Sequence, residues 1–147
     1  IVINQKYNIM KSKLFLVFLM SILSVSLFAQ MNISTNFRQD GIWDKEKEEW
    51  TIFSTNDEEL TFFEFNKDYT MFKHTTASIT SAYMIKSQKY DEENERYEFD
   101  VVSDVGNKYF MIFDIKGENV RFIYERDGEL YLVQHSIKKV WFEEENE

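Results

Sequence analysis

Residues 96–136 read RYEFDVVSDVGNKYFMIFDIKGENVRFIYERDGELYLVQHS, and this stretch decides the fold. Apolar and polar residues alternate in four short runs, which is typical of strands with one buried face. Turn segments at residues 103–107, 116–119 and 126–129 separate the runs. The last of them contains Asp-Gly, and glycine accepts the positive φ that a tight hairpin requires. The stretch therefore predicts four consecutive antiparallel strands.

The flanking segments continue this pattern at a spacing of about 8–12 residues. Further strands are expected at residues 41–43, 50–54, 60–65, 69–75 and 79–89, with 137–142 extending the last one. Residues 31–40 are expected to be a polar lead-in, and residues 44–49, 54–59 and 91–95 to be turns; a short helical turn is the alternative for 44–49. The pattern predicts an all-β, antiparallel up-and-down meander of about eight or nine strands, forming a small barrel or half-open barrel. A two-layer sandwich remains the alternative.

Composition limits the function classes. The 147 residues allow one domain, and 14 Phe with 8 Tyr supply ample material for a core. The absence of Cys excludes disulfides, thiolate metal sites and a cysteine nucleophile. Residues 1–29 hold three lysines and no acid, which leaves 14 basic and 26 acidic residues, a formal charge of −12, from residue 30 on. Such an acidic domain is not expected to bind nucleic acid, because phosphate binding needs a basic footprint.

The amino terminus has the order of a secretory signal peptide that starts at Met10. A basic segment, residues 10–13, precedes the apolar run 14–23 and a small, weakly polar segment that ends near Ala29. An uncleaved anchor helix is the alternative, but 16 residues from Leu14 to Ala29 are fewer than the roughly 20 that span a bilayer. We therefore expect residues 1–29 to be removed, residues 30–142 to form one β domain and residues 143–147 to be an acidic tail. The protein is then exported, periplasmic or secreted, with no stable membrane span.

Gly41-Ile42-Trp43, at the start of the expected meander, resembles the G-x-W signature of lipocalins. Length and strand order are also similar to the short lipocalin-like, calycin-type β-barrel domains of exported bacterial proteins. In that family the Trp lies on the first strand and closes one end of the barrel, so the resemblance implies a calyx for a small apolar molecule. No arginine follows Arg126, so the resemblance is carried over for Trp43 alone.

Catalytic and metal-binding motifs are not recognisable. His74 and His135 are 61 residues apart in predicted strands, without a close ligand spacing, and we expect them to be half exposed. There is no G-x-S-x-G elbow, and the acidic run 91–95 lacks the spacing and glycine of a calcium loop. We therefore expect no enzyme, no metal and no cofactor. A carboxylate pair that acts on glycans is the enzymatic alternative, because its geometry is three-dimensional.

Inward-facing aromatic residues could form a filled core or line a pocket. The candidates are Phe62, Phe65, Phe72, Tyr83, Phe99, Tyr109, Phe113, Phe122 and Tyr124. The first hypothesis is a non-enzymatic barrel that binds a small apolar ligand through Trp43, Phe99, Tyr109, Phe113 and Phe122. The second is a filled-core protein that binds another envelope protein through an exposed apolar face or sheet edge. Several runs, such as 108–114 and 121–133, are apolar on both faces, which favours a second layer or a partner on the outside.

Overall fold

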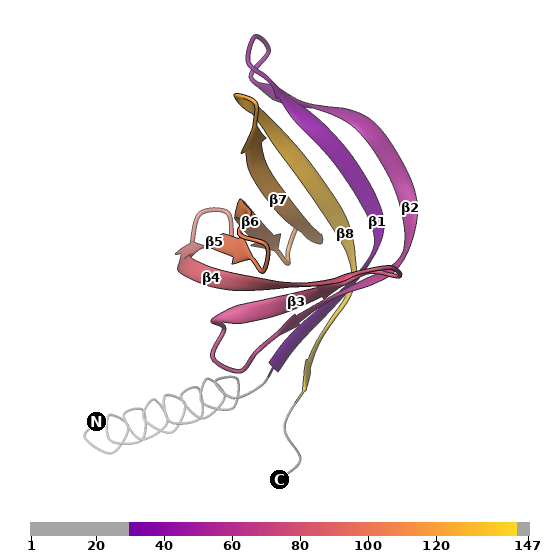
Figure 1. The fold of residues 1–147 in the computed structure, drawn as a ribbon, viewed down its shortest axis with the longest axis vertical. Coiled ribbons are helices and arrows are strands. Elements are labelled where there is room, and N and C mark those ends of the chain that lie inside the picture. The colour runs from indigo at the N-terminus through magenta and orange to yellow at the C-terminus, as the bar shows by residue number, and fades with distance from the viewer. Residues whose placement is uncertain (1–29, 144–147) are drawn as a thin grey trace, which may run out of the picture. The chain divides into compact units, whose positions relative to one another are not determined.

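The computed structural model describes residues 30–143, and within them it shows eight strands and no helix. The predicted signal segment and residues 144–147 of the acidic tail lie outside the described residues. Strands pair in chain order into a closed barrel, which confirms the predicted all-β meander (Figure 1). The strands are β1 (Gln30–Asp44), β2 (Glu49–Phe65), β3 (Met71–Thr75), β4 (Thr80–Asp91), β5 (Arg96–Ser103), β6 (Lys108–Asp114), β7 (Asn119–Arg126) and β8 (Glu129–Glu143). No helix of the described part is long and apolar enough to cross a membrane.

Two segments that the sequence predicted to be irregular are strands. Residues 31–40, expected as a lead-in, belong to β1, and residues 54–59, expected as a turn, continue β2 without a break. These polar residues pair with each other: Arg38 lies opposite Asn56, and Asp40 lies opposite Ser54. A register shift between Thr35 and Phe37 accommodates the extra residues of β2. Partner-strand hydrogen bonds therefore hold these residues in a sheet despite their low β-propensity.

The hairpin after residue 44 is confirmed, and two other hairpins repeat its design. In each, an aspartate precedes the turn and a glutamate four residues later adopts a left-handed conformation: Asp44 and Glu48 (φ 54°), Asp91 and Glu95 (52°), Asp114 and Glu118 (54°). The aspartate Oδ1 accepts backbone N–H groups of the turn, as Asp44 does from Glu46 at 3.0 Å and Lys47 at 3.1 Å. These bonds, that from Lys47 foremost, lower the pKa of Asp44. Asx-type turns thus replace the glycine and proline that the chain largely lacks.

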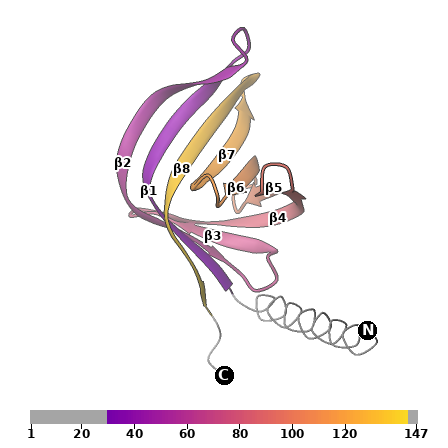
Figure 2. The same ribbon diagram turned by 180° about the vertical axis from the view of Figure 1, so that it is seen from behind.

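The strands differ greatly in length, and the barrel is therefore taller on one side. β1, β2 and β8 have 15, 17 and 15 residues, whereas β3 and β6 have only 5 and 7. β3 pairs with β2 only over residues 62–65, so within the described chain residues 49–61 of β2 have only β1 as a strand neighbour. Figures 1 and 2 show β7, β8, β1 and β2 rising as a curved wall above the ring that all eight strands complete.

The interior of the closed ring is filled with aromatic side chains. Phe113 is fully buried, and its ring centroid lies 5.0 Å from that of Phe65 and 5.5 Å from that of Phe99. Tyr69, beside the β2–β3 turn, packs on Phe65 at 5.6 Å and covers this end of the core. Burying each such side chain contributes about 1.5–3 kcal/mol. The buried cluster is Ile33, Phe63, Phe65, Phe72, Tyr83, Phe99, Val101, Met111, Phe113, Val120 and Phe122.

On the outer face, a row of polar side chains joins the last strands to the first. Arg121 Nε donates to Gln134 Oε1 at 3.1 Å, and Gln134 Nε2 donates to Gln39 Oε1 at 3.2 Å. The second bond links β8 to β1, the two strands whose pairing closes the barrel. Because Gln39 and Gln134 face outward, their neighbours Arg38 and His135 face the interior.

Replacing Glu48 with glycine is expected to raise the free energy of unfolding by about 1 kcal/mol, because a left-handed backbone strains every residue that carries a Cβ. Glu46 lies in the same turn at negative φ, so Glu46→Gly is the matched control and should stabilise nothing. Urea denaturation of the three proteins measures both effects. Equal changes in the two variants would contradict this account of the turn.

Candidate functional site

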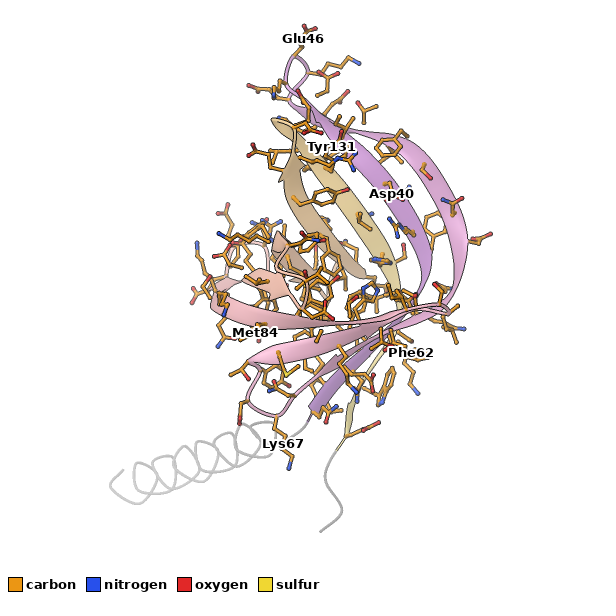
Figure 3. All side chains as sticks on the ribbon, viewed as in Figure 1. Asp40, Glu46, Phe62, Lys67, Met84 and Tyr131 are labelled. Carbon is orange, nitrogen blue, oxygen red and sulfur yellow. The ribbon has the colours of Figure 1, made fainter. Side chains whose placement is uncertain are left out.

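An open pocket of about 740 Å³ lies above the filled core, against the tall wall. Its lining combines four Phe and Tyr side chains with charged and polar ones, and it comprises Arg38, His74, Tyr83, Gly106, Asn107, Lys108, Tyr109, Phe122, Tyr124, Glu125, Arg126, Val133 and His135. In Figure 3, Asp40 and Tyr131 are labelled on the tall strands, below Glu46 at the β1–β2 tip, and Lys67 marks the opposite end of the barrel. The interior is therefore filled in one half and hollow in the other.

Both histidines of the chain meet at the floor of this pocket. His74 comes from β3 and His135 from β8, and their ring centroids are 5.4 Å apart at an interplanar angle of 76°. The Phe63 ring stacks on His74 at 4.4 Å and 5°. His135 is only 2% exposed, so the expectation of a half-exposed ring is wrong for His135, whereas His74 is partly exposed. Alternation along each strand puts His74 on the face of Phe72, and barrel closure turns that face inward.

The imidazole of His74 is held in its neutral form. Burial, followed by the charges of His135 and Arg38, lowers the pKa of His74 to about 3. Its Nε2 atom is buried and has no hydrogen-bond partner among the described residues. A neutral imidazole nitrogen in an apolar environment gains from any ligand group that completes its hydrogen bonding.

Tyr83, beside the histidines, is also held neutral. Burial, then the neighbouring Tyr109 and Asp104, raises the pKa of Tyr83 to about 12. Its ring stacks on Phe72 at 4.9 Å and lies 5.6 Å from Phe122, so the core fixes its position. At the floor of the pocket, His74 and Tyr83 are therefore uncharged groups, aromatic in body and capable of hydrogen bonding at their polar atoms.

Charged side chains lie higher on the pocket walls. Arg38, Lys108 and Arg126 contribute three cations, and Glu125 contributes one carboxylate. Arg38 is paired with Asp40, Nη2 to Oδ1, at 2.6 Å. Even with Asp40 included, cations outnumber carboxylates here, although residues 30–147 carry a formal charge of −12. The pocket therefore has the opposite charge bias to the domain around it.

The residues predicted to bind ligand fall into three places. Tyr109 and Phe122 line the pocket, whereas Phe99 and Phe113 lie in the filled core. Trp43 packs against Trp50 at the β1–β2 hairpin, with ring centroids 5.2 Å apart, and it is not part of the core cluster. Of the wider aromatic set, Phe62 lies against Trp141 at 6.4 Å instead of in the core cluster. That any of these residues contacts a ligand stays a prediction.

Sequence analysis missed Arg38 and both histidines. Arg38 was assigned to a lead-in, where a side chain has no defined direction. The histidines did carry a signal, because His74 alternates with Phe72 and His135 with Val133. Within the described residues, no three His, Asp or Glu side chains gather into a metal-binding group, so the two rings alone are not assigned a metal.

We expect the protein to lose stability as the pH falls below about 6.5. The unfolded chain protonates His74 near that pH, whereas the folded protein resists protonation down to about pH 3, so the unfolded state binds more protons in this window. Between pH 7 and pH 5 this single group should lower the free energy of unfolding by about 2 kcal/mol. Denaturation of wild type and His74→Phe at both values measures the difference, because all other groups are common to both.

A second measurement is the NMR titration of the two imidazole rings in the folded protein. His74 should keep the shifts of a neutral ring throughout this window. Titration of His74 near its ordinary pKa, or parallel stability curves for wild type and variant, would contradict the assignment of a buried, neutral ring.

Comparison of the chain with protein-family models, with curated proteins and with solved structures returns no match. The lipocalin resemblance therefore rests on Gly41-Ile42-Trp43 and on an eight-stranded meander barrel that is compatible with that fold.

Proposed function

We propose that this chain is an exported, non-enzymatic protein that binds a small amphiphilic molecule in the open pocket of its barrel. The observation that carries the proposal is the division of the interior into an aromatic core and a pocket of about 740 Å³. Pockets that bind small molecules commonly measure about 300–1,000 Å³, with aromatic walls and a few polar groups. The pocket above His74 and His135 has this size and this lining.

The polarity of the lining determines the ligand class that we propose. Sequence reasoning predicted a purely apolar ligand, but the pocket combines four aromatic walls with cations and neutral hydrogen-bonding groups. The aromatic walls are Tyr83, Tyr109, Phe122 and Tyr124. A wholly apolar ligand would leave the buried Nε2 of His74 without a partner. A molecule with an apolar body and a polar group fits both parts of the lining.

We propose binding instead of catalysis because of the protonation states of His74 and Tyr83. A general base works best when its pKa lies near the working pH. The pKa of His74 lies far below neutrality and that of Tyr83 far above it. Neither group is therefore poised to exchange a proton at neutral pH.

Binding of a second protein is the other candidate function, and the edge of β2 favours it. Among the described residues, segment 49–61 lies beside β1 alone, and Phe53 within it is 62% exposed. A free edge of this length is suited to accept a strand from a partner. The small-molecule proposal ranks first because it accounts for the pocket as well as the core.

An anionic aromatic dye of the anilinonaphthalenesulfonate type should bind the folded protein at one saturable site, as measured by fluorescence and calorimetry. Tyr124→Ala removes one pocket wall and is expected to weaken dye binding about tenfold. Tyr90→Ala is the matched control, because Tyr90 is exposed and does not line the pocket. A cooperatively unfolding protein that gives no saturable signal, or equal losses in both variants, would contradict the proposal.

A further inference from the structure

The pairing between β6 and β7 ends beside the pocket before either strand does, which leaves an opening in the hydrogen-bonded wall. These two strands pair from Asp114–Asn119 up to Phe110–Ile123. Beyond this point the pairing of β6 with β5 runs on to Lys108, and that of β7 with β8 runs on to Arg126. The ends of β6 and β7 are therefore paired with their outer neighbours and not with each other.

A second hollow, of about 560 Å³, lies at this opening and is named here the lateral groove. Four residues line both the lateral groove and the inner pocket: Lys108, Tyr109, Tyr124 and Glu125. Two come from β6 and two from β7, one pair on each side of the opening. The rings of Tyr109 and Tyr124 are in edge-to-face contact, with centroids 5.6 Å apart at 71°. The two hollows thus meet at one pair of tyrosines.

We propose that the ligand is an elongated amphiphile whose anionic head group lies in the inner pocket and whose apolar chain passes over the Tyr109–Tyr124 pair, beyond the last paired residues of β6 and β7, into the lateral groove. This inference rests on the proposed function and specifies its ligand. The two hollows share the wall that Tyr109 and Tyr124 form, and a ligand that occupies both has chemically different surroundings at its two ends.

The apolar end follows from the outward side chains around the opening. Phe110 and Ile123 are cross-strand partners, and both line the lateral groove with Val102 and Leu130. Phe110 and Leu130 are 36% and 37% exposed, which leaves apolar surface in contact with water. An alkyl chain laid over these residues would remove that surface from water. The outward apolar residues of β6 and β7 would then contact the alkyl chain, while the inward ones form the core.

The anionic head group follows from the charge bias inside. Arg38, Lys108 and Arg126 border the inner pocket, whereas the rest of the domain is strongly acidic. In the lateral groove the charges balance, because Lys86 and Lys108 are matched by Asp100 and Glu125. An anion is therefore favoured at the inner end of the site.

The test is a series of straight-chain fatty acids, from hexanoate to palmitate, competing with the anionic dye for the purified protein. Wild type should bind longer chains more tightly, and the double variant Phe110→Gln/Leu130→Gln should lose about tenfold in palmitate affinity. Hexanoate, short enough for the inner pocket alone, should lose less than about twofold. Ile79→Gln is the control, because Ile79 is exposed outside the groove. Alcohols of equal chain length should bind more weakly than the acids.

The outcomes separate this inference from the proposed function. If neither the dye nor any fatty acid binds the folded protein, both fail. If dye and hexanoate bind but palmitate binds no more tightly, or if the double variant affects both acids equally, the lateral groove is not part of the site and only the inference is overturned. Equal affinity for acids and alcohols would overturn the anionic head group.

Discussion

The unequal length of the strands is the constraint on which the rest of this structure depends. Backbone N–H and C=O groups need partners, so a ring can close only where all eight strands are present. β3 and β6, with 5 and 7 residues, restrict that ring to one end of the barrel. Side chains that meet inside the closed ring, such as Phe65 and Phe113, pack into a solid core. Above this core the long strands extend past the ends of the short ones, so no side chains from an opposite strand fill the space beside them. The pocket lies in this space.

Phe63 connects these two halves. Its ring contacts Phe113 of the core at 6.1 Å and both histidines of the pocket floor, His74 at 4.4 Å and His135 at 5.6 Å. The imidazoles therefore rest on the same aromatic packing that stabilises the ring. Protonation of His74 is therefore unfavourable in the folded protein, because the ring packs against the core. This couples the stability of the fold to the protonation state of His74.

The sequence predicted the meander because local signals produce it: alternating runs, Asp-Gly at 127–128 and aspartate-led turns. It did not predict that β2 continues through residues 54–59. These residues are polar because they lie at a sheet edge that faces solvent, and they form a strand only because they pair with β1. The pocket escaped prediction for the same reason. The position of the pocket depends on where the short strands end relative to the long ones. Arg38, which lines it, lies in a segment that has no apolar pattern. Tyr109 and Phe122 were found because alternation alone places them inside.

Strands that are apolar on both faces predicted a second layer or a partner. In the structure, some of the outward apolar residues are covered by neighbouring side chains, and others stay exposed. Ile112 is buried beside its cross-strand partner Arg121, whose stem covers apolar surface while its head bonds to Gln134. Leu132 is buried where Gly41 lets Ile52 approach: a Cβ at Gly41 would lie 3.0 Å from Ile52 Cδ1 and 3.8 Å from Leu132 Cβ. The glycine of Gly41-Ile42-Trp43 thus has a packing role that requires no family. At the β6–β7 opening, no neighbouring strand supplies such cover, and Phe110 and Leu130 stay exposed beside the pocket.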